Sequence, residues 1–153
     1  PSIISNNFME KIKHVISDLK LNEDVKIISN FLSNDESLFH ISQSDLVVYP
    51  YQKSGESASG AVRHGISSGV KVLVTPLSIF EDVEQAVFYT NGTSAISIAE
   101  SILNSYLGIE NFNHSNVNTK SITTEKWKSQ HYYSILSSRF EGMLLGLLRS
   151  KYI

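Results

Sequence analysis

The chain contains no cysteine in its 153 residues. Without cysteine there is no disulfide, no thiolate nucleophile and no cysteine-ligated zinc site, and the composition fits a reducing compartment such as the cytoplasm. An excess of basic charge is also absent, because 13 Lys and Arg stand against 15 Asp and Glu and give a net charge of −2. Domains that bind nucleic acid normally carry a basic excess, so DNA and RNA are not expected partners.

Long hydrophobic runs are missing as well, and no stretch approaches the roughly 18 apolar residues of a membrane-spanning helix. Metal-ligand spacing is not found among the histidines, so no metal is expected. The chain begins with Pro1 rather than Met and shows no basic-then-apolar signal pattern. We therefore expect it to be a piece of a longer protein, with one domain-sized core at this length.

Short apolar runs alternate with segments of helical periodicity over residues 1–108. Strands are predicted at 25–28, 46–49, 72–74 and 87–89, and helices at 7–21, from Ser33 or Asn34, from Ser57 or Ser59 to Gly69, and at 96–107. The runs at 46–49 and 72–74 lack polar alternation, which indicates strands covered on both faces. This order predicts an α/β fold, a Rossmann-like three-layer domain with a parallel sheet that binds ligands at the carboxyl ends of its strands.

The last third of the chain has a different character. Residues 109–123 hold clustered asparagines without a period and are predicted to be a linker. Residues 124–153 carry apolar residues at mixed spacings of three and four, which predicts a C-terminal helical tail, either one long amphipathic helix or two helices broken near Gly142. Its apolar stripe packs on the domain's own sheet or contacts a missing domain or a membrane surface.

One segment has a choice of residues that folding alone does not explain. It lies where the strand at 46–49 ends and the next helix begins. Small residues there let a ligand approach the backbone, and the first amides of a helix point outward without intrahelical partners, which suits a phosphate or diphosphate. These residues are Ser57, Ala58, Ser59 and Gly60. The preceding Glu56 would repel phosphate but suits sugar hydroxyls. The alternative is that Glu56 only favours the helix N-terminus and the serines only cap it.

The run from Glu56 to Gly69, followed by Val70–Pro76, resembles the carboxyl-terminal, donor-binding domain of retaining glycosyltransferases of the GT-B fold, specifically family four. The signature of that family is a glutamate, seven residues, a second glutamate, and then a small-residue turn into a strand. The segment Ser44–Pro50 and a tail with Trp127 and a long helix agree with the same pattern. The resemblance covers nearly the whole chain, with the motifs in the right order.

Carried over by position, the resemblance implies that Glu56 binds hydroxyls of the donor sugar. It implies that the diphosphate is held by the backbone amides of Ser57, Ala58, Ser59 and Gly60. The second signature glutamate, which grips the ribose in the family, falls at His64, so this chain departs from the pattern there. An imidazole can still bond a hydroxyl, which makes His64 a candidate ribose ligand.

The resemblance implies a hexosyltransferase that uses a nucleotide-diphosphate sugar as donor substrate, without metal or cofactor, and a glycan or lipid-linked acceptor. It also implies an N-terminal acceptor-binding domain and a first strand with a basic diphosphate clamp, neither of which this chain contains. Lys53 and Arg63 lie near the motif but are expected to be mainly solvated. The chain alone is therefore expected to be inactive, and the full protein to act in the cytoplasm, with peripheral membrane contact as an open alternative.

Two other readings stay open: a non-catalytic nucleotide-sugar-binding or assembly module, and a nucleotide-sugar epimerase of the same architecture. A hydrolase is disfavoured because Gly55–Ser59 lacks the final glycine of the nucleophile elbow and does not directly follow a strand. A P-loop is disfavoured because Ala61 and Val62 stand where Lys and Ser or Thr are required.

Overall fold

The computed structural model describes residues 3–53, 55, 57–108 and 117–150. The chain divides into two compact units, Pro1–Ser33 and Asn34–Ile153. This boundary falls inside the segment 1–108 that the sequence predicts to be one domain.

The first unit consists of helix α1 (Ile3–Asp18) and the segment that follows it. The helix ends in a Schellman-type turn, in which the amide of Leu21 bonds the carbonyl of Ile16 and Lys20 takes a left-handed φ of 57°. The strand predicted at 25–28 is wrong, because these residues have no regular secondary structure and belong to no sheet. A strand needs a neighbour for its backbone groups, and the described residues supply none there.

The second unit is built on a three-stranded parallel sheet of β1 (Leu46–Tyr49), β2 (Lys71–Val74) and β3 (Phe88–Tyr89), in the order β1-β2-β3. Val47 pairs with Val72, and Leu73 pairs with Phe88. The three strands and their parallel arrangement confirm the predicted α/β class. The carboxyl ends of all three strands consequently meet at one edge of the sheet.

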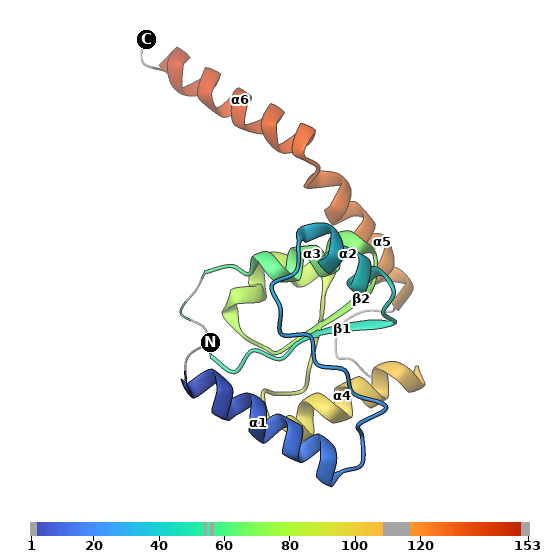
Figure 1. The fold of residues 1–153 in the computed structure, drawn as a ribbon. Helices are drawn as coiled ribbons and strands as arrows, with labels where there is room; N and C mark the ends of the chain where they lie inside the picture. The colour runs from blue at the N-terminus through green and yellow to red at the C-terminus, as the bar shows by residue number, and fades with distance from the viewer. Residues whose placement is uncertain (1–2, 54, 56, 109–116, 151–153) are drawn as a thin grey trace. The chain divides into compact units, whose positions relative to one another are not determined.

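Four helices are interleaved with these strands: α2 (Asn34–Ser42), α3 (Gly60–Ser68), a 3₁₀ helix η1 (Ser78–Ala86) and α4 (Ala95–Leu107). Figure 1 shows α2 and α3 on one side of the sheet and α4 on the other. The predicted end of α3 is confirmed, since Gly69 caps it with a left-handed φ of 81° that glycine adopts without a steric penalty.

The hydrophobic core lies between α3, the sheet and η1. Its buried members are Val62, Ile66, Val72, Val74, Ile79, Phe80, Val83, Ala86 and Val87. The predicted strand at 72–74 is buried, as its unbroken apolar run indicates. This core fixes α3 against the sheet, and with it the turn that contains the candidate site.

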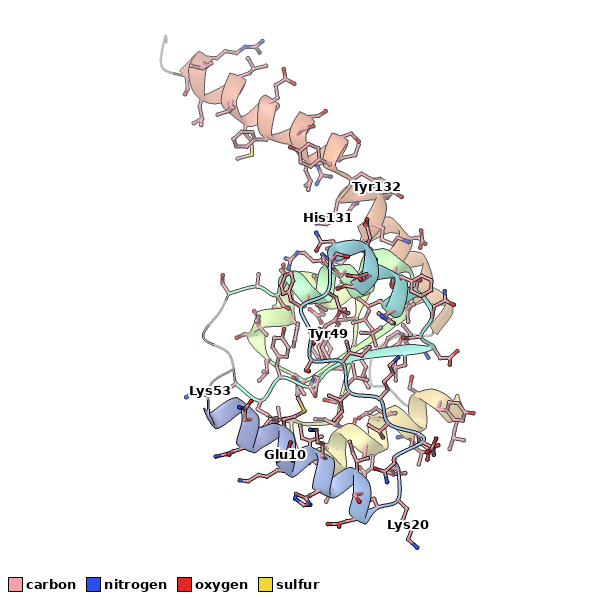
Figure 2. The ribbon with its side chains drawn as sticks, in the orientation of Figure 1. Glu10, Lys20, Tyr49, Lys53, His131 and Tyr132 are labelled. Atoms are coloured by element: carbon pink, nitrogen blue, oxygen red, sulfur yellow. The ribbon has the colours of Figure 1, made fainter. Side chains whose placement is uncertain are left out.

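The tail forms two helices, α5 (Val117–Gln130) and α6 (Tyr133–Ser150). Of the predicted linker, residues 109–116 lie outside the described residues and 117–123 are helical, in a helix that Trp127 anchors against the core. The predicted break near Gly142 is wrong. The break lies at His131 and Tyr132, and the Tyr132 carbonyl accepts the amides of Ile135 and Leu136 in the first turn of α6 (Figure 2). A single glycine in an exposed helix interior costs only about 1 kcal/mol relative to alanine, so α6 continues through Gly142.

The apolar stripe of the tail divides between these helices. Trp127 of α5 packs against the core, whereas α6 buries none of its residues, and Phe140 on α6 is 62% exposed. Within the part of the chain that the structure describes, no helix combines the length and apolar character needed to cross a membrane.

Candidate functional site

The candidate site is the turn between β1 and α3, at the carboxyl edge of the sheet. Ser59 is the N-cap of α3, with an extended backbone and a side chain that accepts a 3.4 Å hydrogen bond from the amide of Val62. Ser59 is only 2% exposed, and its hydroxyl lies 3.3 Å from the Tyr51 hydroxyl. Its capping role, one of the two alternatives for the serines, is therefore confirmed.

The next two amides of the helix remain available. Among the described residues, the amides of Gly60 and Ala61 have no hydrogen-bond partner. Ser57, Ala58 and Gly60 are exposed, and a Cβ added at Gly60 would meet no atom within 4 Å. An anion could approach the start of α3 directly, where the helix dipole is favourable. The amide of Ala61 was not among the predicted ones, although the second residue of a helix also has an unpaired donor.

Arg63 is held by the protein rather than solvated as predicted. One of its guanidinium nitrogens donates a 2.6 Å hydrogen bond to the carbonyl of Ser59, and another forms an ion pair with Asp82 of η1. The sequence prediction failed here because the partner carboxylate comes from a distant segment. Arg63 therefore braces the beginning of α3 against η1, and Asp82 balances its charge.

The structure leaves the prediction for Glu56 untested and agrees with the prediction that Lys53 is solvated. Glu56 lies outside the described residues, so its expected contact with sugar hydroxyls stays a prediction. Lys53 is exposed and labelled in Figure 2, where it lies on the loop that follows β1.

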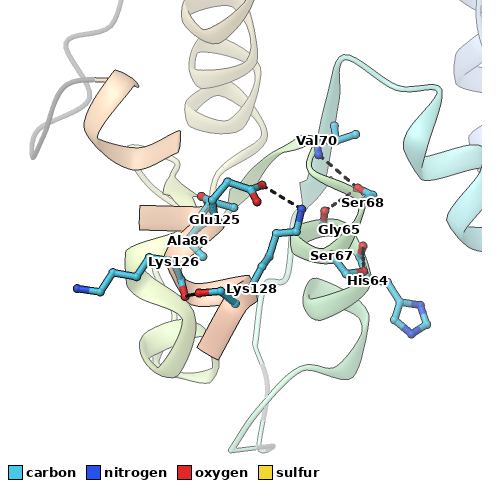
Figure 3. Close-up of polar contacts among 11 residues, drawn as sticks. His64, Gly65, Ser67, Ser68, Val70, Ala86, Glu125, Lys126 and Lys128 are labelled. Atoms are coloured by element: carbon cyan, nitrogen blue, oxygen red, sulfur yellow. Dashed lines mark hydrogen bonds and ion pairs between the residues drawn. The ribbon is translucent and has the colours of Figure 1, made fainter. Parts of the chain in front are cut away.

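His64 lies one helical turn after Gly60, about 6 Å further along the axis of α3. Gly60 and His64 lie on the face of α3 opposite the buried side formed by Val62 and Ile66. His64 is half-buried. Its carbonyl accepts a hydrogen bond from the Ser67 hydroxyl at 2.9 Å, and Figure 3 shows its ring directed away from the other labelled residues. His64 is thus on the same face of α3 as Gly60, without a described side-chain partner.

The loops at the carboxyl edge are tied to one another. The Gln52 side chain, after β1, donates a 2.8 Å hydrogen bond to the carbonyl of Thr93, after β3. Between them, the hydroxyl of Thr75, after β2, donates to the carbonyl of Tyr51 at 2.7 Å. Gln52, Tyr51 and Thr75 were not predicted from the sequence. The sequence signal that could have found these residues is a polar residue directly after a buried strand. Thr75 fits it most clearly, because it follows β2 directly.

Close packing places α3 on the sheet. A Cβ added at Gly65 would lie 3.0 Å from the Cγ2 of Val72 and 3.1 Å from the hydroxyl of Tyr49. The Tyr49 hydroxyl in turn donates a 2.7 Å hydrogen bond to the carbonyl of Ala61. These contacts determine the distance and angle at which the first turn of α3 meets the carboxyl edge.

Two tyrosines near this framework have shifted acidity. Burial raises the pKa of Tyr49, and the pKa of Tyr89 is raised to about 12, first by burial and then by the nearby carboxylates of Glu84, Glu81 and Asp82. The Tyr89 hydroxyl donates a hydrogen bond to the Phe80 carbonyl at 3.2 Å.

Two hollows of the surface are lined by described residues outside this turn. A groove of about 350 Å³ is found at the amino ends of β1 and β2, lined by Asp45, Leu46, Lys71, Ile102, Ser105 and Tyr106. A more open one of about 390 Å³ lies between α2 and α3. The turn at Gly60 lines neither of these two hollows. Over the described residues, no group of three or more His, Asp and Glu is arranged to hold a metal ion.

Comparisons of the chain with protein-family models, with curated proteins and with solved structures found no match.

Proposed function

We propose that the chain is the nucleotide-sugar-binding domain of a retaining glycosyltransferase of the GT-B fold, which transfers a hexose from a nucleotide-diphosphate donor to a glycan or lipid-linked acceptor. The resemblance of the Glu56–Gly69 run to family four motivates the proposal. The structural observation that carries it is the exposed start of α3, where the amides of Gly60 and Ala61 lack partners among the described residues at the carboxyl edge of a parallel sheet.

The chemistry assigned to this turn is stabilisation of the leaving group. When the bond between the sugar and the diphosphate breaks, negative charge develops on the phosphate oxygens, and fixed backbone donors lower the energy of that state. Glu56 binds hydroxyls of the donor sugar in this proposal, and the amides of residues 57–60 hold the diphosphate. His64 bonds a ribose hydroxyl from the same face of α3.

The proposal includes a second domain that binds the acceptor. Retaining transfer requires donor and acceptor to be oriented together, and the family resemblance assigns acceptor binding to a separate domain. The chain alone is expected to bind donor without turnover. We place the full protein in the cytoplasm, where a lipid-linked acceptor would bring it to the membrane surface.

A non-catalytic nucleotide-sugar-binding module is the second candidate. It is favoured by His64, which replaces the second glutamate of the family signature and has no described side-chain partner that would orient it. Such a module would use the same amides without supporting transfer.

The binding site is tested with a matched pair of substitutions at Gly60. Gly60→Pro removes one amide donor, and proline is tolerated at the first position of a helix when the preceding residue is extended, as Ser59 is. Gly60→Ala keeps the donor and fills only open space. Calorimetric titration with uridine, guanosine and adenosine diphosphate glucose should give a dissociation constant about 10-fold or more weaker for Gly60→Pro, but nearly unchanged for Gly60→Ala.

Failure of all three nucleotide sugars to bind the unsubstituted chain would refute the proposed site. The class of function is then decided with the full-length protein and a labelled nucleotide sugar. Transfer to an acceptor supports the glycosyltransferase, release of an epimerised donor supports an epimerase, and binding without turnover supports the non-catalytic module.

A further inference from the structure

The turn between β3 and α4 contains the pair Asn91-Gly92, which is the one Asn-Gly sequence in the chain. Asn91 is exposed, and Thr90 before it is buried. The turn lies at the carboxyl edge of the sheet, in the same set of loops as Gln52 and Thr93. Nothing in the proposed binding of a nucleotide sugar assigns a role to Asn91.

Hydrogen bonds hold the backbone on both sides of this pair. The amide of Asn91 donates to the hydroxyl of Ser101 at 3.1 Å, and the hydroxyl of Thr90 donates to the carbonyl of Gly92 at 2.6 Å. Within the described residues, the amide of Gly92 itself has no hydrogen-bond partner. The turn therefore presents an exposed carboxamide next to an unpaired backbone nitrogen that no Cβ shields.

We propose that Asn91 is a site of spontaneous deamidation in the folded protein. The backbone nitrogen of Gly92 attacks the side-chain Cγ of Asn91, and a C–N bond forms to close a succinimide. The C–N bond to the side-chain amino group breaks, and that group takes the proton of the Gly92 amide and leaves as ammonia. Water then opens the ring at one of its two carbonyls, which produces either aspartate or isoaspartate.

The two products change the turn in different ways. Both place a carboxylate at the carboxyl edge of the sheet, where it repels an anion bound nearby. Isoaspartate also inserts one carbon into the main chain, between the amide that Ser101 holds and the carbonyl that Thr90 holds. The 2.8 Å bond from Gln52 to Thr93 lies just beyond this insertion and is expected to weaken.

Asn104 provides a control within the same protein. It lies inside α4 and is followed by Ser105, so the next backbone amide is engaged in the helix and its nitrogen cannot approach the side chain. The two asparagines thus differ in the local geometry that the reaction needs.

The test is incubation of the folded chain in mildly alkaline buffer at physiological temperature, followed by peptide mapping with mass spectrometry and enzymatic detection of isoaspartate. The Asn91 peptide should convert to aspartate and isoaspartate at least about 10-fold faster than the Asn104 peptide, because only Asn91 precedes an unshielded glycine nitrogen. Asn91→Gln should abolish isoaspartate at this position, since a longer side chain closes a less favourable ring.

Gly92→Ala should slow the reaction as well, although the new Cβ would lie 3.2 Å from the Ser97 hydroxyl, so circular dichroism must show that the variant is folded. Urea-denatured protein gives the decisive comparison. If Asn91 reacts in urea but stays unmodified in the folded chain, the native turn protects it and the proposal is wrong.

Discussion

The hydroxyl of Tyr49 on β1 donates a 2.7 Å hydrogen bond to the carbonyl of Ala61 on α3. Ala61 is the second residue of the helix, and its own amide is one of the two donors available to an anion. A side chain of the central sheet therefore holds the same peptide region that the candidate site presents to solvent.

Removal of this bond should destabilise the protein modestly. Tyr49→Phe keeps the ring but deletes the donor, so we expect the free energy of unfolding to fall by about 1 kcal/mol in urea denaturation. Tyr106→Phe is the matched control, because Tyr106 on α4 is 83% exposed. Equal effects of the two substitutions would show that the Tyr49 bond contributes nothing specific.

Gly65 should be the glycine of α3 that least tolerates a side chain. Gly65→Ala forces a Cβ against Val72 and Tyr49, and overpacking of this kind costs about 1–3 kcal/mol. Gly60→Ala adds the same methyl group to the same helix in open space and should be neutral or slightly stabilising. Thermal unfolding of both variants measures the difference. A Gly65→Ala variant as stable as Gly60→Ala would contradict the observed packing of α3 on the sheet.

Stability should decline in alkaline solution through Tyr89. Its pKa in the folded protein is raised to about 12 by burial and then by the carboxylates of Glu84, Glu81 and Asp82, whereas an unfolded tyrosine titrates near its ordinary value of about 10. The unfolded state therefore loses its proton first as the pH rises. The contribution of Tyr89 to the free energy of unfolding is complete below about pH 10 and is lost progressively toward about pH 12.

The contribution of Tyr89 is isolated by comparing urea unfolding curves of the original chain and Tyr89→Phe across this pH range. The variant lacks the bond to the Phe80 carbonyl and starts less stable, but its stability should decline less steeply with pH. Identical slopes for the two proteins would rule out Tyr89 as the source of the alkaline loss.

Glu56 should discriminate between a nucleotide sugar and the nucleotide alone. A carboxylate reserved for sugar hydroxyls contributes only when the sugar is present, so Glu56→Gln should weaken nucleotide-sugar binding far more than nucleotide binding in calorimetric titrations. Glu100→Gln, on exposed α4, removes the same charge away from the turn and serves as the control. Equal losses for both ligands with Glu56→Gln would contradict its assigned role.

Much of the second unit was predictable from local patterns. The runs 46–49 and 72–74 are strands, as their unbroken β-branched and apolar residues predict. Only 72–74 is buried as predicted, because β2 is the central strand, whereas β1 lies at the edge of the sheet and is half-buried. Ser59 and Gly69 delimit α3 as predicted, since an N-cap hydroxyl and a left-handed glycine act within a few residues of their own position. The prediction at 25–28 was wrong because a strand is completed by a partner strand, and among the described residues none pairs with this segment.

The sequence by itself determined the α/β class, the limits of α3 and the unpaired amide of Gly60 at its beginning, because these follow from side chains and backbone groups that are close along the chain. Only the tertiary structure decided that Arg63 pairs with Asp82, that Gln52 joins the loops after β1 and β3, and that Gly65 lies against Tyr49 and Val72. Each of these contacts joins segments separated in sequence. Their formation depends on how the parallel strands bring those segments together, and no local pattern contains that information.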